Sequence, residues 1–119
     1  MNIEAYREYC LTKKGVTEAF PFDEDVLVFK VMNKIFALSS LSSDPFRVNL
    51  KCDPEWAITL REQHDDITPG YHMNKKHWNT VLFETNLDDA FLKQLIDHSY
   101  EQVVKSLTKK LQAQLADFS

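Results

Sequence analysis

Residues that can bind a phosphate group or a flat ring are concentrated between Pro69 and Val81. These thirteen residues include two lysines, two histidines, two other aromatic residues and two asparagines. A lysine can neutralise a phosphate, an aromatic ring or imidazole can stack on a base, and the amides of Asn74 and Asn79 can bind polar edges. The segment therefore predicts a site for nucleic acid or another ligand, with candidate residues Tyr71, His72, Asn74, Lys75, Lys76, His77 and Trp78.

The same segment also has a purely structural interpretation. Trp78 opens a predicted strand and can belong to the core, while Asn74 and His77 can fix a long loop by binding backbone groups. Both interpretations stay open. A loop that only connects two elements does not need this many polar and aromatic side chains, so a binding role remains reasonable.

Two further basic residues lie on the strand predicted at Phe46–Cys52. Apolar and polar residues alternate along it, so Arg47 and Lys51 share its polar face. If that face is open to solvent, these two residues extend the positive surface of Lys75 and Lys76. Otherwise they are ordinary charges on a solvated sheet.

Catalytic and metal-binding patterns are absent from the sequence. His72 and His77 lie five residues apart, which does not put them on one face of a helix, and no cysteine or carboxylate stands at a metal-ligand spacing. Ser99 directly follows His98, and adjacent helix residues point in different directions. The chain has only two glycines, too few for a glycine-rich phosphate-binding loop. We therefore expect a protein that is not an enzyme and that uses no metal and no cofactor.

The composition is that of one globular domain spanning residues 1–119, with 44% hydrophobic residues. The net charge of −4 and the pI near 5.5 argue against a strongly basic nucleic-acid binder. Cys10 and Cys52 form no CxxC pair and are predicted to be buried free thiols. A charged N-terminus and the lack of a long apolar run predict a cytoplasmic protein without a membrane span.

The elements that must position these residues are predicted in the order α–β–β–β–α–β–α–α. Helices are expected at 2–13, at 53–63 behind an Asp53 cap, from Asn86 onward, and after a cap at Ser106 or Thr108. Strands are expected at Val26–Met32, Ile35–Ser39, Phe46–Cys52 and Trp78–Phe83, with residues 65–77 irregular.

The short connection between the first two strands makes the sheet antiparallel. Its expected turn is Asn33–Lys34, because asparagine tolerates a positive φ. About four strands with one face covered by helices give an α+β fold, a two-layer sandwich.

Five blocks of residues occur in a characteristic order along nearly the whole chain. They are Phe20-Pro-Phe-Asp23, Val28-Phe-Lys-Val31 with Lys34-Ile-Phe-Ala-Leu38, Asn49-Leu-Lys-Cys-Asp-Pro-Glu55, Pro69-Gly-Tyr-His-Met-Asn-Lys-Lys-His-Trp78 and His98-Ser-Tyr100. Together they resemble the MmcQ/YjbR family of small bacterial proteins, and the block at 69–78 is the most specific. Two positions depart from the family pattern: Asn33–Lys34, where relatives often carry glycine, and Thr108, where a proline is common.

The resemblance implies a CyaY-like α/β sandwich that has been likened to a double-wing DNA-binding architecture, and it carries over no catalytic residue. It favours DNA binding through the basic and aromatic loop at 69–81 as the first hypothesis. The alternative is a module that binds a small molecule or a protein partner through the same aromatic residues.

Overall fold

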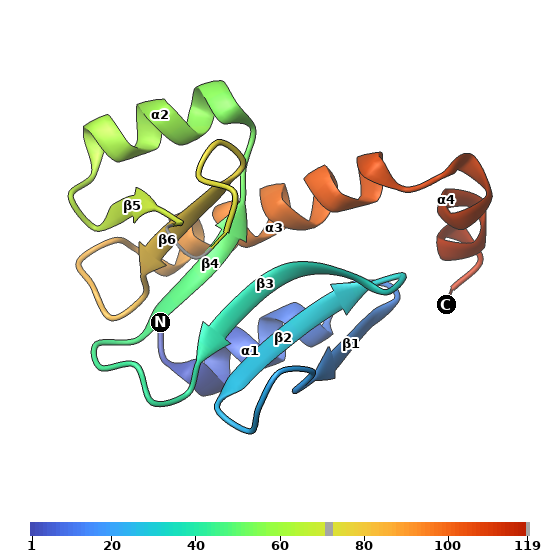
Figure 1. Cartoon of the computed structure of the whole chain (residues 1–119), viewed down its shortest axis with the longest axis horizontal. Coiled ribbons are helices and arrows are strands. Elements are labelled where there is room, and N and C mark those ends of the chain that lie inside the picture. Colours follow the sequence, from blue (N-terminus) through green and yellow to red (C-terminus); the bar gives the residue numbers. More distant parts are fainter. Residues whose placement is uncertain (71–72, 119) are drawn as a thin grey trace.

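The structure of the chain is a computed structural model that describes residues 1–70 and 73–118 (Figure 1). No helix in these two ranges is long and apolar enough to cross a membrane. The mixed α+β class predicted from the sequence is confirmed. In chain order the elements are α1 (Ile3–Leu11), β1 (Val16–Ala19), β2 (Val26–Val31), β3 (Lys34–Ser40), β4 (Arg47–Lys51), α2 (Pro54–Gln63), β5 (Ile67–Pro69), β6 (Trp78–Leu82), α3 (Asp89–Ser106) and α4 (Lys109–Ala116).

Six strands form one antiparallel sheet in the order β1-β2-β3-β4-β6-β5. The prediction of about four strands is wrong because it omits β1 and β5. Both lie at the edges of the sheet and contain only four and three residues. Strands this short show no clear alternation of apolar and polar residues, and β5 lies inside the segment expected to be irregular.

The turn between β2 and β3 has Met32 and Asn33 at its central positions. Both residues have a positive φ, of 50° and 69°, as a type I′ hairpin turn requires. Lys34 already pairs with Val31. The predicted turn at Asn33–Lys34 is therefore one residue too late.

A short polar side chain caps each of the four helices within residues 1–70 and 73–118. Asn2, Asp53, Asp88 and Thr108 each accept a hydrogen bond from an amide in the first turn. The cap predicted at Asp53 is confirmed, and of the two caps considered for the last helix, Ser106 and Thr108, Thr108 is the one observed. The start predicted at Asn86 is wrong, because Asp88 caps a helix that begins one residue later.

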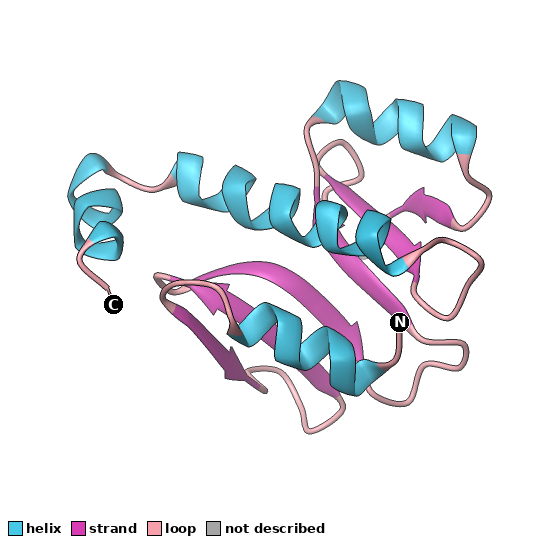
Figure 2. Cartoon of the chain, turned by 180° about the vertical axis from the view of Figure 1, so that it is seen from behind, coloured by secondary structure: helices cyan, strands magenta, loops and turns pink. Residues whose placement is uncertain are grey.

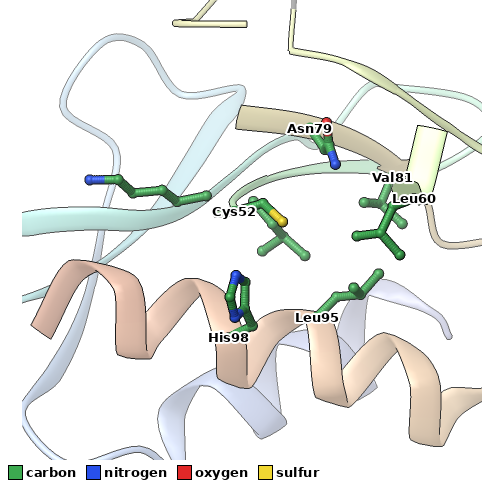
Figure 3. A pocket seen from close by; sticks show the side chains of 8 residues that line it. Cys52, Leu60, Asn79, Val81, Leu95 and His98 are labelled. Carbon is green, nitrogen blue, oxygen red and sulfur yellow. The ribbon is translucent and has the colours of Figure 1, made fainter. Parts of the chain in front are cut away.

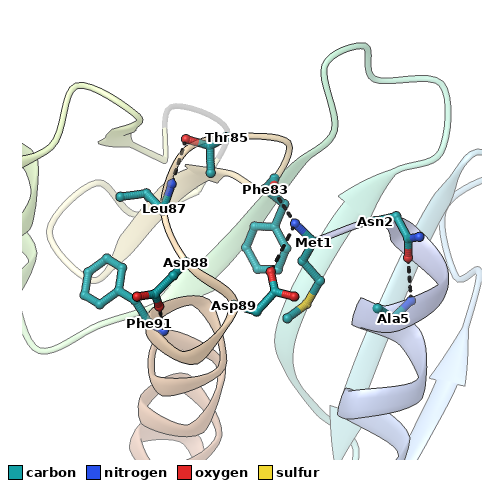
Figure 4. A network of polar contacts seen from close by, with 9 residues as sticks. All are labelled: Met1, Asn2, Ala5, Phe83, Thr85, Leu87, Asp88, Asp89 and Phe91. Atoms are coloured by element: carbon teal, nitrogen blue, oxygen red, sulfur yellow. Dashed lines mark hydrogen bonds and ion pairs between the residues drawn. The ribbon is translucent and has the colours of Figure 1, made fainter.

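The starts of α1 and α3 lie close together, as Figure 4 shows. The amino group of Met1 donates to the Phe83 carbonyl at 2.7 Å and pairs with the Asp89 carboxylate at 3.5 Å. These contacts link the first residue of the chain to the end of β6 and to the first turn of α3.

Helices α1 and α3 lie across one face of the sheet (Figure 2). Tyr6 of α1 anchors the core between them, where its ring meets the rings of Phe29, Phe46 and Phe83 edge-on at 5.4–5.5 Å. The buried stripe of α3 comprises Leu92, Leu95, Ile96, Ser99 and Val103.

No described helix crosses the opposite face of the sheet (Figure 1). On β4, Val48 and Leu50 are buried, whereas Arg47 and Lys51 have access to solvent. The predicted alternation along β4 is confirmed. Its polar side chains therefore reach the uncovered face.

Candidate functional site

The loop between β5 and β6 begins with a close approach of Gly70 to Trp78. The Gly70 amide donates to the Trp78 carbonyl at 2.9 Å. A Cβ atom at position 70 would lie 3.0 Å from Trp78 Cβ and 3.1 Å from the Trp78 carbonyl oxygen. A larger residue would push Trp78 back by a few tenths of an ångström, so this close approach of the two backbones favours glycine. Tyr71 and His72, two of the predicted binding residues, lie outside the described residues.

Asn74 shapes the part of this loop that carries both lysines. Its side-chain oxygen accepts from the Lys76 amide at 2.9 Å, and its carbonyl accepts from the His77 amide at 3.1 Å. This is the bonding of an Asx turn, so the structural interpretation of Asn74 is confirmed. Lys75 and Lys76 consequently project from a defined turn, and both are exposed.

Arg61 of α2 holds the loop from the side. Its Nε donates to Asn79 Oδ1 at 2.7 Å, and its Nη2 donates to the Lys75 carbonyl at 2.5 Å. Asn79 is only 2% exposed, so it does not read polar edges of a ligand as the sequence suggested. Arg61 was not among the predicted site residues, although a basic residue in the last turn of the helix that precedes β5 and the loop is a signal for such a contact.

The antiparallel register of β4 and β6 puts Lys51 beside Trp78. Directly paired residues point to the same face of a sheet, here the uncovered one. The Cys52 amide also donates to the His77 carbonyl at 2.7 Å, which ties the end of β4 to the loop. These two contacts bring the backbone of the loop that carries Lys75 and Lys76 to the end of β4, next to the half-buried indole of Trp78. We call this region the basic end and define it as Lys51, Lys75, Lys76 and Trp78.

Arg47 does not belong to the basic end. It lies four residues before Lys51 on β4, a separation of about 13 Å along a strand. Its guanidinium donates to the Pro45 carbonyl at 3.3 Å, and it lines a surface hollow of about 120 Å³ together with Asp65 and Asp66. The structure therefore separates two basic residues that the sequence placed on one positive surface.

Helix α3 holds the end of β4 from the covered face. Ser99 Oγ accepts from the Lys51 amide at 2.8 Å and donates to the Phe36 carbonyl. His98 Nε2 accepts from the Asp53 amide at 3.0 Å. Burial lowers the pKa of His98, which favours the neutral ring that can accept this bond.

A cavity of about 10 Å³ lies beneath the basic end, between β4, β6 and α3 (Figure 3). Cys52, Asn79 and His98 line it, and the Asn79 amide nitrogen has no hydrogen-bond partner among the described residues. This volume holds at most about one water molecule, so the cavity is too small for an organic ligand.

Both cysteines are buried free thiols, as the sequence predicted. Burial raises the pKa of Cys10 and of Cys52 to about 12. Neither thiol is therefore poised as a nucleophile. Within residues 1–70 and 73–118, no three His, Cys, Asp or Glu side chains are grouped so that they could hold a metal ion.

Comparison with known proteins identifies relatives of similar length. The family model described as YjbR matches residues 11–102. Escherichia coli K12 contains an uncharacterized protein YjbR that is 36% identical over 92% of this chain and 93% of its own. The uncharacterized protein YbdF of Escherichia coli O157:H7 is 40% identical over 90% of this chain and 88% of its own.

Two crystal structures have a similar fold. The Deinococcus radiodurans protein DR2400 matches with a TM-score of 0.90 and 39% identity, covering 97% of this chain and 88% of that one. A Pseudomonas syringae protein matches with a TM-score of 0.75 and 29% identity, covering 86% of this chain and 98% of that one.

Proposed function

The chain belongs to the YjbR family, and we propose that it is a DNA-binding module that uses the basic end. Lys51, Lys75 and Lys76 contact backbone phosphates, and Trp78 packs against a sugar or base. The observation that carries the proposal is the pairing of Lys51 with Trp78 on the uncovered face of the sheet, where the loop with both other lysines returns.

The chemistry of the basic end suits a nucleic acid better than an isolated anion. Several lysines spaced along one edge can follow successive phosphates, and each releases counterions when it binds. An adjacent indole adds a surface on which a base can stack without sequence preference. The overall charge of −4 does not prevent this, since the electrostatic potential near a site is set mainly by charges within a Debye length of about 8–10 Å.

The proposed activity is binding without catalysis. Both thiols are held protonated by burial, and the Ser99 hydroxyl is engaged by the Lys51 amide and the Phe36 carbonyl. The double-wing and CyaY-like likeness implied by the family resemblance agrees with DNA binding. A likeness of folds does not by itself assign a function, so the proposal depends on the residues of the basic end.

A salt titration of DNA binding tests the proposal. Fluorescence anisotropy with a short labelled duplex should give saturable binding at low salt. Three phosphate contacts predict a slope of log K against log salt of about −2.7. The double variant Lys75→Ala/Lys76→Ala should bind more weakly, with a slope that is shallower by about two.

The matched control is Lys109→Ala/Lys110→Ala at the start of α4, which removes the same charge from an exposed lysine pair elsewhere. It should bind DNA nearly as the unmodified chain does. Equal losses in the two double variants, or no binding at low salt, would refute the proposal. The second outcome would leave the alternative of a small molecule or protein partner at the same loop.

A further inference from the structure

A hollow of about 390 Å³ lies between α1 and the segment that joins β1 to β2. Its apolar lining comes from Ile3, Phe20, Leu27 and Leu41. Leu27 is 3% exposed and forms the floor, whereas Phe20 and Leu41, at 48% and 42%, stand open as walls. Small-molecule sites are concave, mostly apolar and about 300–1,000 Å³ in volume. This hollow, which we call the N-terminal groove, has the size and lining of such a site.

The Leu41 wall is fixed before any ligand arrives. The Leu41 amide donates to the Asp25 carbonyl at 2.7 Å. The Asp25 carboxylate accepts from the Ser42 amide at 2.9 Å and from the hydroxyl groups of Ser40 and Ser42. A preformed wall lowers the entropy that binding must overcome.

The charged lining of the groove is acidic overall. Arg7 and Glu18 face each other across it in a two-bond pair, at 2.7 and 2.6 Å. The guanidinium holds the pKa of Glu18 below its usual range, and the carboxylate raises the pKa of Arg7. The Arg7 guanidinium and the Glu18 carboxylate therefore both stay charged, and their opposite charges cancel. The remaining charge is the exposed carboxylate of Glu4, so the lining carries one net negative charge.

From this lining we propose that the N-terminal groove binds a small organic monocation with an aromatic or branched aliphatic body. The body packs on Leu27 between Phe20 and Leu41, and the cationic group lies beside Glu4. The groove shares no residue with the basic end, so this site is independent of DNA binding.

A free small molecule fits the groove better than a peptide that extends the sheet. The adjacent edge strand β1 has only four residues, and its Glu18 is engaged by Arg7. Short, charged edges resist the addition of another strand. The groove therefore offers an apolar hollow without a usable strand edge beside it.

A matched pair of probes tests the charge preference. 4-Phenylbutylamine, a cation at pH 7, and 4-phenylbutyrate share one apolar body. In a two-dimensional ¹H–¹⁵N NMR titration, the amine should shift the amides of residues 3–7, 18–20 and 41 in a saturable way. The carboxylate should bind about two- to fivefold more weakly, the range expected for one exposed ion pair.

Two variants separate charge from packing. Glu4→Lys should reverse the preference and favour the carboxylate, while Leu41→Ser should weaken both probes. Equal affinity of the two probes, shifts outside the groove, or an unchanged preference in Glu4→Lys would each overturn the proposal. So would at least about tenfold tighter binding of the peptide Ac-Lys-Phe-Lys-Phe-NH₂, because the occupant would then be a protein segment.

Discussion

The loop at 73–77 and the loop at 20–25 each turn around one short polar side chain, yet they present opposite charges. Asn74 accepts from the Lys76 amide at 2.9 Å. Asp23 accepts from the Asp25 and Val26 amides at 2.8 and 3.1 Å. The first loop carries two lysines, whereas the second carries the three carboxylates of Asp23, Glu24 and Asp25. The same local geometry therefore serves two surfaces of opposite chemistry.

The two loops differ in what holds them in the fold. Arg61 reaches the first loop from α2 and binds both the Lys75 carbonyl and the buried Asn79. The second loop instead holds its neighbour, since Asp25 accepts hydrogen bonds from Ser40 at the end of β3 and from Ser42 in the turn that follows. Local hydrogen bonds can thus fix the backbone conformation of a turn, whereas residues far away in the sequence fix where that turn lies in the fold.

Removing the Arg61 guanidinium should have the largest effect on stability. Arg61→Ala leaves the Asn79 oxygen and the Lys75 carbonyl without this donor. A bond to a charged donor contributes about 1.5–3 kcal/mol. The bond to Asn79 is partly buried, whereas the bond to the Lys75 carbonyl is exposed and contributes less, so we expect a loss of about 2–3 kcal/mol in all. Urea unfolding followed by tryptophan fluorescence measures it, and the amides of 75–77 should exchange faster with solvent.

Arg7→Ala is the matched control for Arg61→Ala. Arg7 pairs with Glu18 at the N-terminal groove in an exposed position. Solvent screens such a pair, so the loss should be clearly smaller. If Arg7→Ala destabilises the chain as much as Arg61→Ala does, the partly buried bond of Arg61 to Asn79 is not what makes its contribution large.

A smaller loss is expected from Ser99→Ala. This change leaves the Lys51 amide and the Phe36 carbonyl unpaired in a buried place, which should cost about 1–2 kcal/mol. Ser106→Ala on the same helix removes an exposed hydroxyl bonded to the Val103 carbonyl and should change little. Equal effects would mean that α3 does not fix the end of β4 through Ser99.

The fold could be predicted wherever a local signal was strong. The alternation along β4, the buried stripe of α3 and the caps at Asp53 and Thr108 each follow from residues close together in the sequence. The edge strands β1 and β5 could not be recognised, because each is too short to display a period. Their pairing depends on β2 and β6, which provide the backbone partners.

The candidate site was predicted as a set of residue types but not as an arrangement. The pairing of Lys51 with Trp78 depends on the register of β4 and β6, which are separated in the chain by α2 and β5. The same register leaves Arg47 at the far end, next to Leu82. Such contacts arise from packing across the sheet and have no local sequence signal.

The smallest expected effect is a difference in acid sensitivity between the end of β4, next to His98, and the ion pair of Arg7 with Glu18. Burial lowers the pKa of His98 from 6.5, against opposing contributions from the nearby Asp53 and Glu101. The unfolded chain therefore takes up a proton near pH 6.5 that the folded chain resists, and stability falls as the pH drops below that value. The pKa of Glu18 is lowered from 4.5 by Arg7, so its contribution is complete above that value and lost only below it.

Urea unfolding measured from pH 7.5 to pH 3.5 resolves the two windows. His98→Gln keeps an acceptor for the Asp53 amide and cannot titrate, so it should flatten the decline between pH 6.5 and 4.5. That decline should be below about 1 kcal/mol, since His98 is only half-buried and solvent screens its charge. Glu18→Gln should leave this upper window unchanged and alter only the lower one. If His98→Gln leaves the upper window unchanged, protonation of the ring is not what first loosens the segment between β4 and α2, and the basic end has no acid sensitivity of its own.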